Sequence, residues 1–549
     1  MEHFLRESTG EWKLRGFRLD AVLFDFDGTL TRPGAIDFDG LKAALDTAPG
    51  TYALEHLSAL DPGPERERAL GILHRFEAEG AERSRPNDGA EEIVAWLRGI
   101  GVPLGMITRN TLPMVERALE NFDHLSLEDF DVIVTREAPV PFKPEPDTIL
   151  LAAEELGVHP ERCAMVGDFV VDVEAGNRAG AVTVHLVDPS DPDLIDHEPD
   201  FRIARLEELR EVVQMGRPLA PGKLPIELLE RHLDRLTVDP SVIVGAGVGQ
   251  DVAVLDVPPG EVLVAHPDPI TLATEGIARY AVVVNANDIA TSGAEPLWFL
   301  ATVLLPVGTT GSEALALLGE LSAECSAAGV SLVGGHTEVT DAVGRPVVSG
   351  TMFGTVARDD LRAKQGVLAG DALVFTQRVA VEGTVLLAQE LGGRLASLGM
   401  SEEELGECLA FEGRLSVLEA ARVARGFEGV RAMHDVTEGG FSTAVREIAT
   451  ACRRDVVVDL DAVPVFGLTQ RICELMGVDP LGLIGSGSLL ISCSQDDVDG
   501  LLEACAERDI EATVVGVFAE GEGNATAVRS GRPAELPAFA VDEAARVLS

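Results

Sequence analysis

The sequence has few lysines and a large excess of acidic residues. It contains 91 Asp and Glu residues against 44 Lys and Arg residues, and its formal net charge is −47 at pH 7. A chain with this charge repels the phosphate backbone of nucleic acids, which argues against a nucleic-acid partner. The five lysines are Lys13, Lys42, Lys143, Lys223 and Lys364.

Two interpretations of this charge are open. The chain is either an ordinary acidic protein or a halophilic one, solvated for a high-salt cytoplasm where ions screen the self-repulsion of a highly charged molecule. We favour the second interpretation.

Long hydrophobic runs are also absent. No apolar stretch is long enough to cross a bilayer, although 46% of the residues are hydrophobic. The N-terminal stretch MEHFLRESTGEWKLRG lacks the apolar core of a signal peptide. We therefore expect a globular, cytoplasmic protein with no membrane partner.

The seven cysteines are scattered along the chain and form no CxxC pair. This pattern predicts buried, reduced thiols in place of metal ligands or disulfides. They are Cys163, Cys325, Cys408, Cys452, Cys473, Cys493 and Cys505.

At 549 residues the chain is too long for a single hydrophobic core, and we expect about three domains. Between residues 18 and 212, short β-branched runs alternate with amphipathic helical patterns, which predicts a doubly wound, Rossmann-like parallel α/β sheet. Helical spacing in an insertion at about residues 35–87 predicts a small helical cap on this domain. The expected strands contain AVLFDFD, PLGMITR, DVIVTRE, CAMVGD and VTVHLV.

The longer remainder, rich in Gly, Ala and Val, is expected to form two α+β subdomains with a break near residues 357–371. The stretch VQMGRPLAPG contains two prolines and two glycines and suits a linker. The expected divisions are an N-terminal segment at 1–17, the capped domain at 18–212, the linker at 213–222, and subdomains at 223–360 and 361–549.

Polar side chains gather where the predicted parallel strands end. Ligands of such sheets bind beyond the carboxyl ends of the strands, so these side chains should converge. Carboxylates a few ångströms apart repel one another unless a cation neutralises them, and Mg²⁺ prefers oxygen ligands. The residues concerned are Asp25, Asp27, Thr108, Arg109, Asn110, Lys143, Asp168 and Asp172.

In their order along the chain, DFDGT, the strand-end Thr108, Lys143 before its helix and GDFVVD resemble the four motifs of the haloacid dehalogenase superfamily of phosphatases. The resemblance covers about residues 18–212 and implies hydrolysis of a small phosphorylated metabolite. It makes Asp25 the nucleophile that takes the phosphoryl group. It makes Asp27 the acid/base that protonates the leaving oxygen and then activates water.

The same resemblance implies a Mg²⁺ site. Its ligands would be Asp25, Asp168 and the main-chain carbonyl of Asp27, while Asp172 would support the metal or Lys143. The expected contacts to the substrate are Thr108 and Lys143 on the phosphoryl oxygens, with Arg109 and Asn110 as further candidates.

The second half begins with VGAGVGQDVAVLD at residues 244–256. This is no Rossmann fingerprint, because its glycines are spaced GxGxG and strand-like residues follow where a helix should begin. Further along, acids and amides recur beside small residues, a pattern that suits Mg²⁺-bridged polyphosphate against backbone amides, although each one alone suits a turn. The set is Asp251, Asp268, Asn285, Asp288, Glu338 and Asp435.

The stretches GQDVAV, NDIATSGAEP and HDVTEGG resemble the aminoimidazole ribonucleotide (AIR) synthetase superfamily, which includes selenophosphate synthetase, thiamine monophosphate kinase and a hydrogenase maturation protein. The match covers about residues 223–549. It implies ATP with Mg²⁺ in a cleft and a homodimer formed through residues 223–360. The metal and phosphate ligands carried over are Asp251, Asp268, Asp288 and Asp435, with Asn285 as a further candidate.

The sequence also departs from this superfamily. It lacks the reactive Cys (or selenocysteine) and Lys that selenophosphate synthetases place before the first motif. It ends in AVDEAARVLS, without the C-terminal cysteine that accepts the carbamoyl group in the hydrogenase maturation protein. What remains is ATP-dependent activation of an oxygen, on a small acceptor or on an amide or carboxylate. His336, in GGHTEV, is either a hydrogen-bonded loop histidine or a substrate contact.

Two hypotheses for the whole chain stay open. It is a bifunctional enzyme, a Mg²⁺-dependent phosphatase fused to an ATP-using module that phosphorylates or activates a small metabolite. Alternatively, it is a phosphatase regulated by a non-catalytic, nucleotide-sensing and dimerising C-terminal module.

Overall fold

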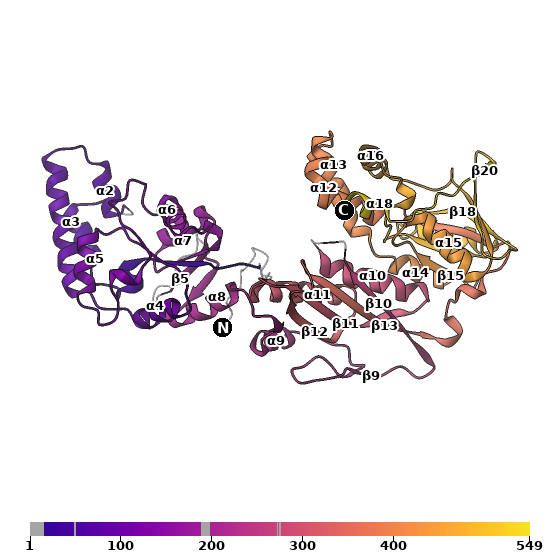
Figure 1. Ribbon diagram of the computed structural model, residues 1–549, viewed down its shortest axis with the longest axis horizontal. Helices are drawn as coiled ribbons and strands as arrows, with labels where there is room; N and C mark the ends of the chain where they lie inside the picture. Colours follow the sequence, from indigo (N-terminus) through magenta and orange to yellow (C-terminus); the bar gives the residue numbers. More distant parts are fainter. Residues whose placement is uncertain (1–15, 49–50, 188–197, 272, 274–275, 549) are drawn as a thin grey trace. The chain divides into compact units, whose positions relative to one another are not determined.

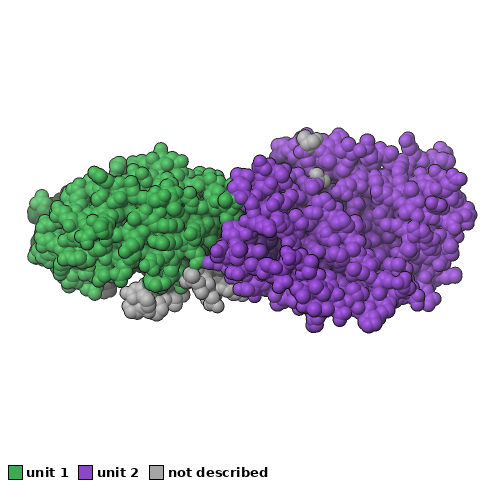
Figure 2. All heavy atoms as spheres, turned by 60° about the horizontal axis from the view of Figure 1, so that its bottom comes forward, with its two compact units in different colours: residues 1–220, 308–316 green, residues 221–307, 317–549 purple. Residues whose placement is uncertain are grey.

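A computed structural model of the chain describes residues 16–48, 51–187, 198–271, 273 and 276–548. The chain divides into two compact units (Figure 2). Unit 1 contains residues 1–220 and 308–316, and unit 2 contains residues 221–307 and 317–549. The N-terminal segment predicted for residues 1–17 lies outside the described residues apart from its last two. The other domain boundaries stay predictions.

Unit 1 is built on a six-stranded sheet in the order β3-β2-β1-β4-β5-β6, and all its strand pairs are parallel. Five of these strands were expected, and β6 was not. The strand order reverses at β1, between β2 and β4, and ligands of open α/β sheets bind beside this point. The strands are β1 (Ala21–Phe24), β2 (Leu104–Ile107), β3 (Val132–Val134), β4 (Cys163–Gly167), β5 (Val182–Leu186) and β6 (Phe201–Ile203).

Helices cover both faces of this sheet, and β1 shows why its sequence is apolar throughout. Val22 and Phe24 belong to one core, with α4 and α8, whereas Ala21 and Leu23 belong to the other, with α6. A strand buried on both faces reads as a continuous hydrophobic run. The helices are α4 (Ala90–Gly99), α5 (Leu112–Leu119), α6 (Asp147–Leu156), α7 (Val170–Ala179) and α8 (Leu209–Gly216), which takes in the first residues of the predicted linker.

The insertion between β1 and α4 forms the predicted helical cap, with a small core of its own (Figure 1). Its first helix begins where the Asp37 side chain accepts a hydrogen bond from the Gly40 N–H, at 2.8 Å. The cap helices are α1 (Phe38–Leu45), α2 (Ala53–Ala59) and α3 (Pro64–Arg83). The capped parallel α/β fold expected from the sequence is therefore confirmed.

The first subdomain of unit 2 contains a five-stranded mixed sheet in the order β10-β13-β11-β12-β7. Helix α10 packs on β10 and β13. The elements are β7 (Gly222–Lys223), α9 (Ile226–Leu233), β8 (Val242–Val244), β9 (Val254–Leu255), β10 (Glu261–Ile270), α10 (Ile277–Thr291), β11 (Glu295–Pro306), β12 (Ser331–Thr340) and β13 (Val347–Ala357), together with α11 (Gly311–Ala327), whose residues 311–316 are counted in unit 1.

The second subdomain has a seven-stranded mixed sheet in the order β15-β17-β14-β18-β16-β19-β20. Its strands are β14 (Ala372–Thr376), β15 (Val430–Asp435), β16 (Asp455–Asp459), β17 (Leu489–Cys493), β18 (Ala512–Ala519), β19 (Ala525–Arg529) and β20 (Arg532–Ala534). Its helices are α12 (Val381–Ser397), α13 (Glu402–Leu409), α14 (Leu418–Arg425), α15 (Gly440–Cys452), α16 (Gly467–Met476), α17 (Val498–Ala506) and α18 (Glu543–Leu548).

All seven cysteines are buried and unpaired with one another, as their spacing predicted. Within the described ranges, no helix is both long enough and apolar enough to cross a membrane.

Candidate functional site

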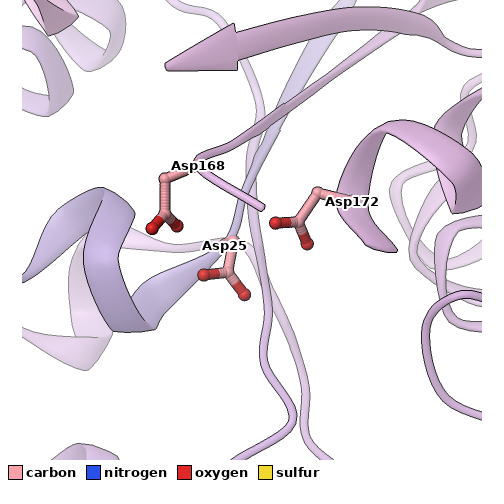
Figure 3. A group of neighbouring side chains, drawn as sticks. All are labelled: Asp25, Asp168 and Asp172. Carbon is pink, nitrogen blue, oxygen red and sulfur yellow. The ribbon is translucent and has the colours of Figure 1, made fainter. Parts of the chain in front are cut away.

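Three aspartates of unit 1 converge beyond the carboxyl ends of β1 and β4 (Figure 3). Asp25 directly follows β1, Asp168 directly follows β4, and Asp172 lies in the first turn of α7. One carboxylate oxygen of each lies within 4.8 Å of the other two. Burial raises the pKa of Asp25 well above its ordinary value, and burial together with Asp172 raises the pKa of Asp168 to about 7. The cluster therefore favours a cation or protons.

Lys143 supplies one positive charge to this cluster. Its Nζ donates to Asp25 Oδ1 at 2.5 Å, to Asp172 Oδ1 at 2.6 Å and to the Ile107 carbonyl at 2.9 Å. Burial alone would lower the pKa of Lys143, but Asp172 and Asp25 raise it above the ordinary value. The lysine therefore stays charged beside Asp25.

Asp27 lies two residues beyond Asp25, and its side chain is outside the group of three. The Asn110 side-chain amide donates to Asp27 Oδ2 at 3.2 Å, and burial raises the pKa of Asp27 to about 6. Near neutral pH this carboxyl can both give and take a proton, as an acid/base must.

Gly28 lets the chain turn directly after the two aspartates. Its φ is +94°, and a Cβ atom there would lie 2.2 Å from Asp168 Oδ2. The next residue, Thr29, donates from its hydroxyl to Asp168 Oδ1 at 2.9 Å. The small residues of DFDGT thus let the loop pack against the Asp168 carboxylate.

The residues after β2 have three different positions. The buried Thr108 hydroxyl accepts a hydrogen bond from the Asn110 main-chain N–H at 3.0 Å. Asn110 faces Asp27, while Arg109 donates to Glu55 of the cap at 2.5 Å. A cavity of about 330 Å³ runs from the three aspartates into the cap, and both Arg109 and Asn110 line it.

A second acidic group lies in unit 2, where α10 contacts β15. Burial is the main cause that raises the pKa of Asp288 to about 7, and the charge of Asp268 raises it further. In the same way, burial is the main cause that raises the pKa of Asp435 to about 7, and the charge of Asp288 raises it further. Burial and Glu438 raise the pKa of Asp268. These carboxyls therefore act on one another, and Asp435 keeps a buried oxygen without a hydrogen-bond partner among the described residues.

Asn285 supports this group from α10. Its amide donates to the Asp268 main-chain carbonyl at 3.2 Å, and its own Oδ1 is buried without a partner in the described part of the chain. The neighbouring Asn287 serves the packing of the two subdomains, because it donates to the Leu415 carbonyl at 2.9 Å and accepts from the Val417 N–H at 2.9 Å.

The other sequence candidates of this half lie elsewhere. Asp251 is exposed, in the segment between β8 and β9. Glu338 and His336 share one face of strand β12, where His336 Nε2 lies 3.1 Å from Glu338 Oε2. His336 is hydrogen-bonded, as one interpretation held, but it lies in a strand and not in a loop. The backbone there is extended because β12 pairs with β11 along this stretch.

Sequence reasoning missed three neighbours of the second group. Lys364 lowers and Glu438 raises the pKa of Asp288, and His266 Nε2 lies 3.2 Å from Asp288 Oδ2. Two of the three left a signal in the sequence. Residues two apart in a strand share a face, and His266 precedes Asp268 by two, while Glu438 lies in the stretch HDVTEGG.

Comparison with known proteins identifies the first half. The family model for haloacid dehalogenase-like hydrolases matches residues 19–180. An uncharacterized hydrolase of Saccharomyces cerevisiae is 30% identical over 208 residues, which cover 37% of this chain and 95% of that protein. The chain belongs to the haloacid dehalogenase-like hydrolases. A haloacid dehalogenase-like hydrolase domain-containing protein of Arabidopsis thaliana is 29% identical over 221 residues.

This membership confirms the prediction that the chain is an enzyme, a hydrolase of the phosphatase type. The second half of this chain lies outside the residues that match the hydrolase family, and it has relatives of its own. Models of the N-terminal and C-terminal domains of AIR synthase related proteins match residues 249–356 and 369–529.

The relatives of this second half include the carbamoyl dehydratase HypE of Escherichia coli, which is 27% identical over 261 residues, 47% of this chain and 74% of HypE. The crystal structure of E. coli HypE gives a TM-score of 0.50 at 21% identity and covers 58% of this chain and 98% of that chain. The likeness confirms the AIR synthetase-like fold. The chain is thus a haloacid dehalogenase-like hydrolase fused to an AIR synthase related module.

Proposed function

We propose that unit 1 hydrolyses phosphomonoesters through a phosphoryl group held transiently on Asp25. The observation that carries this proposal is the position of Asp25, beyond β1 and between a buried lysine and two further carboxylates. Nucleophilic attack by a carboxylate on a phosphate dianion requires positive charge beside it. Lys143 Nζ, 2.5 Å from Asp25 Oδ1, provides one such charge.

In the first step, an Asp25 oxygen bonds to phosphorus while the bond to the leaving oxygen breaks and Asp27 gives that oxygen a proton. In the second step, Asp27 takes a proton from water, whose oxygen bonds to phosphorus and releases Asp25 and inorganic phosphate. The pKa of Asp27, about 6, suits both transfers. We expect the nearby Asn110 amide to orient Asp27.

The three carboxylates also fit Mg²⁺, because they offer only oxygen ligands and lie within 4.8 Å of one another. Asp25 and Asp168 would hold it, with the Asp27 carbonyl, and Asp172 would hold Lys143. When bound, the metal supplies positive charge for the phosphoryl oxygens.

Replacing the nucleophile tests this function. Asp25→Asn should abolish Mg²⁺-dependent hydrolysis of a phosphomonoester and leave the fold intact, because losing the nucleophile raises the barrier by several kcal/mol. The control is Asp39→Asn, an exposed aspartate of the cap. Turnover within about tenfold of wild type in Asp25→Asn would contradict the mechanism.

For unit 2, we propose that Asp268, Asp288 and Asp435 bind ATP through Mg²⁺. The mutual effect of the three carboxyls supports this, since ATP carries about four negative charges and an acidic site repels it unless a metal bridges the two. Asp251, Asn285, Glu338 and the possible substrate contact His336 stay predictions.

The acceptor that ATP activates is, in our proposal, an oxygen and not a thiol. All seven cysteines are buried, and burial raises the pKa of the Cys163, Cys325 and Cys473 thiols to about 12. Thiols of this kind are poor nucleophiles. The carbamoyl chemistry named for HypE is therefore not carried over to this chain.

We also propose that the first subdomain of unit 2 pairs with a second copy. Residues of β10 alternate between half-buried and exposed, and Leu263 on the exposed face has 50% of its surface accessible. An apolar sheet face of this kind is typical of an interface. A cytoplasmic location and a halophilic surface also stay predictions.

Calorimetry on the full chain tests the ATP site. Asp288→Ala should weaken binding of a non-hydrolysable ATP analogue without dissociating the dimer. The control Asp341→Ala, at an exposed position after β12, should leave the affinity for the analogue unchanged. Equal affinity for the analogue in Mg²⁺ and in EDTA, or an affinity of Asp288→Ala equal to that of wild type, would contradict the ligand assignment. Light scattering checks the dimer. Binding without ATP turnover would favour the nucleotide-sensing alternative.

A further inference from the structure

The cavity of unit 1 changes character between the aspartates and the cap. Its floor is charged, with Asp25, Asp168 and Lys143, but most of its wall beyond them is apolar. We call this wall the leaving-group compartment, because an alcohol joined to a phosphate at Asp25 would lie there. It is lined by Ile36, Phe38, Leu41, Tyr52, Leu73 and Phe169.

Aromatic rings in this compartment are unusually accessible for apolar side chains. Phe38 is 52% exposed and Phe169 is 43% exposed, although both line the cavity. Tyr52 and Phe169 meet edge to face, with ring centroids 5.6 Å apart and an interplanar angle of 79°. A flat apolar ligand would cover these rings and remove their surface from water, which is favourable.

The cations around the compartment differ in how strongly they are paired. Arg109 lies 5.8 Å from the Tyr52 ring and donates to Glu55 at 2.5 Å. Arg32 donates to Asp88 at 2.6 Å. A second anionic group on the substrate would have to displace Glu55 from Arg109. The pair of Arg32 with Asp88 is exposed, and Lys42, 5.9 Å from the centre of the Tyr52 ring, has no carboxylate partner among the described residues.

We propose that unit 1 takes the monophosphate ester of an aromatic alcohol, whose ring lies against Tyr52, Phe169 and Phe38. This inference rests on the proposed phosphatase function and adds the class of its substrate. Hydrolysis breaks the bond between phosphorus and the alcohol oxygen, adds water, and releases the aromatic alcohol with inorganic phosphate.

The test compares kcat/KM of the full-length chain with Mg²⁺ for three monophosphates: benzyl phosphate, ethyl phosphate and 2-phosphoglycolate. Benzyl and ethyl alcohol are similar leaving groups, so their ratio reports on contact with the ring. We expect benzyl phosphate to exceed ethyl phosphate by at least about tenfold, since burying a ring is worth that much or more. We expect 2-phosphoglycolate, which has no ring to cover Tyr52 and Phe169, to be poorer than benzyl phosphate.

Variants locate the effect. Tyr52→Ala and Phe169→Ala should each lower the benzyl-to-ethyl ratio, while Tyr52→Phe, which keeps the ring, should preserve it. Leu70→Ala is the control, because Leu70 is exposed on cap helix α3 and does not line the cavity. A ratio near one, a preference for 2-phosphoglycolate, or an unchanged ratio in both alanine variants would overturn the inference while leaving the phosphatase function standing.

A binding measurement separates the two proposals if no ester is hydrolysed. Benzylphosphonate and ethylphosphonate, which cannot be cleaved, are titrated into the full-length Asp25→Asn variant with Mg²⁺. Tighter binding of benzylphosphonate, reduced by Tyr52→Ala, would support the compartment even though the proposed catalysis had failed. Equal binding of the two phosphonates would overturn the inference.

Discussion

At the scale of single residues, buried ionisable groups occur both with and without a partner of opposite charge. Lys143 is buried between two aspartates that keep it charged. Glu382, in the first turn of α12, is also buried, but no basic side chain of the described residues lies within hydrogen-bond distance of it, and its Oε2 has no hydrogen-bond partner at all among them. Burial raises the pKa of Glu382 from 4.5 to about 7. Once Glu382 ionises, it therefore lowers the stability of the fold.

Glu382→Gln should stabilise unit 2 at high pH and leave it nearly unchanged at low pH. An acid whose pKa is raised in the folded state contributes stability at pH values below its unfolded pKa of 4.5. This contribution is lost as the pH rises through its folded pKa of about 7. At pH 8 the variant should gain up to about 3 kcal/mol, and at pH 5 much less. Thermal unfolding at both pH values measures this, with the exposed Glu390→Gln on the same helix as control. An equal effect at both pH values would contradict the pKa.

Gly28→Ala should disable the hydrolase site. Its Cβ would lie 2.2 Å from Asp168 Oδ2 at a φ of +94°, so Asp168 must move. A displacement of about 1 Å at a catalytic group lowers the rate about 10²-fold. Gly101→Ala is the matched control, because its φ is +71°, nothing lies within 4 Å of its Cβ, and Gly101 does not line the cavity. Equal losses of kcat in the two variants would show that backbone strain, and not contact with Asp168, is responsible.

At the scale of elements, a buried ion pair joins the cap to the sheet domain. Glu77 of α3 accepts from Arg136, which follows β3, with one of the bonds at 2.9 Å, and the two side chains are only 5% and 12% exposed. Arg136 also donates to the Arg109 carbonyl at 3.3 Å. The pair therefore holds the cap beside the segment that carries Arg109 and Asn110.

Glu77→Ala should destabilise unit 1 by about 3 kcal/mol, because it leaves the Arg136 charge buried without its partner. Asp88→Ala removes an exposed pair with Arg32, whose side chains are 88% and 62% exposed, and should cost less than about 1 kcal/mol. Chemical denaturation of each variant gives the free energies of unfolding. The double variant Glu77→Leu with Arg136→Met should recover much of the loss, and failure to do so would show that the pair is not the cause.

At the scale of the whole molecule, the net charge of −47 dominates. Most ion pairs of the described residues have at least one exposed side chain, and pairs exposed on both sides, such as Arg178 with Glu145, contribute little. Repulsion among the many remaining carboxylates acts on the whole surface and is screened by salt over about 10 Å at 0.1 M.

The melting temperature should therefore rise steeply from low to molar KCl. Calorimetric scans over this range measure it, and sucrose at matched osmolality is the control, since it does not screen charge. An unchanged melting temperature would count against the halophilic interpretation. An equal rise in sucrose would point to exclusion from the surface in place of screening.

The sequence by itself determined the fold class and the first set of candidates, because each depends on local order. An apolar run followed by Asp25 and Asp27 reads as a buried strand with its site at the end, and a parallel sheet brings all such ends to one edge. Strand β6 escaped detection because the exposed Arg202 interrupts its apolar run, whereas the equally short β3 is apolar throughout.

Only the tertiary structure decided which charges meet. Arg109 is neutralised by Glu55, 54 residues away, and Glu77 reaches Arg136 across 59 residues. Asp288 and Asp435 act on each other from different subdomains, while Asp251 stays exposed in a separate segment. Such pairings depend on how helices and sheets pack, and no periodicity or motif in the chain encodes them. The accessible rings that define the leaving-group compartment arise in the same way, from a cap folded over the ends of the strands.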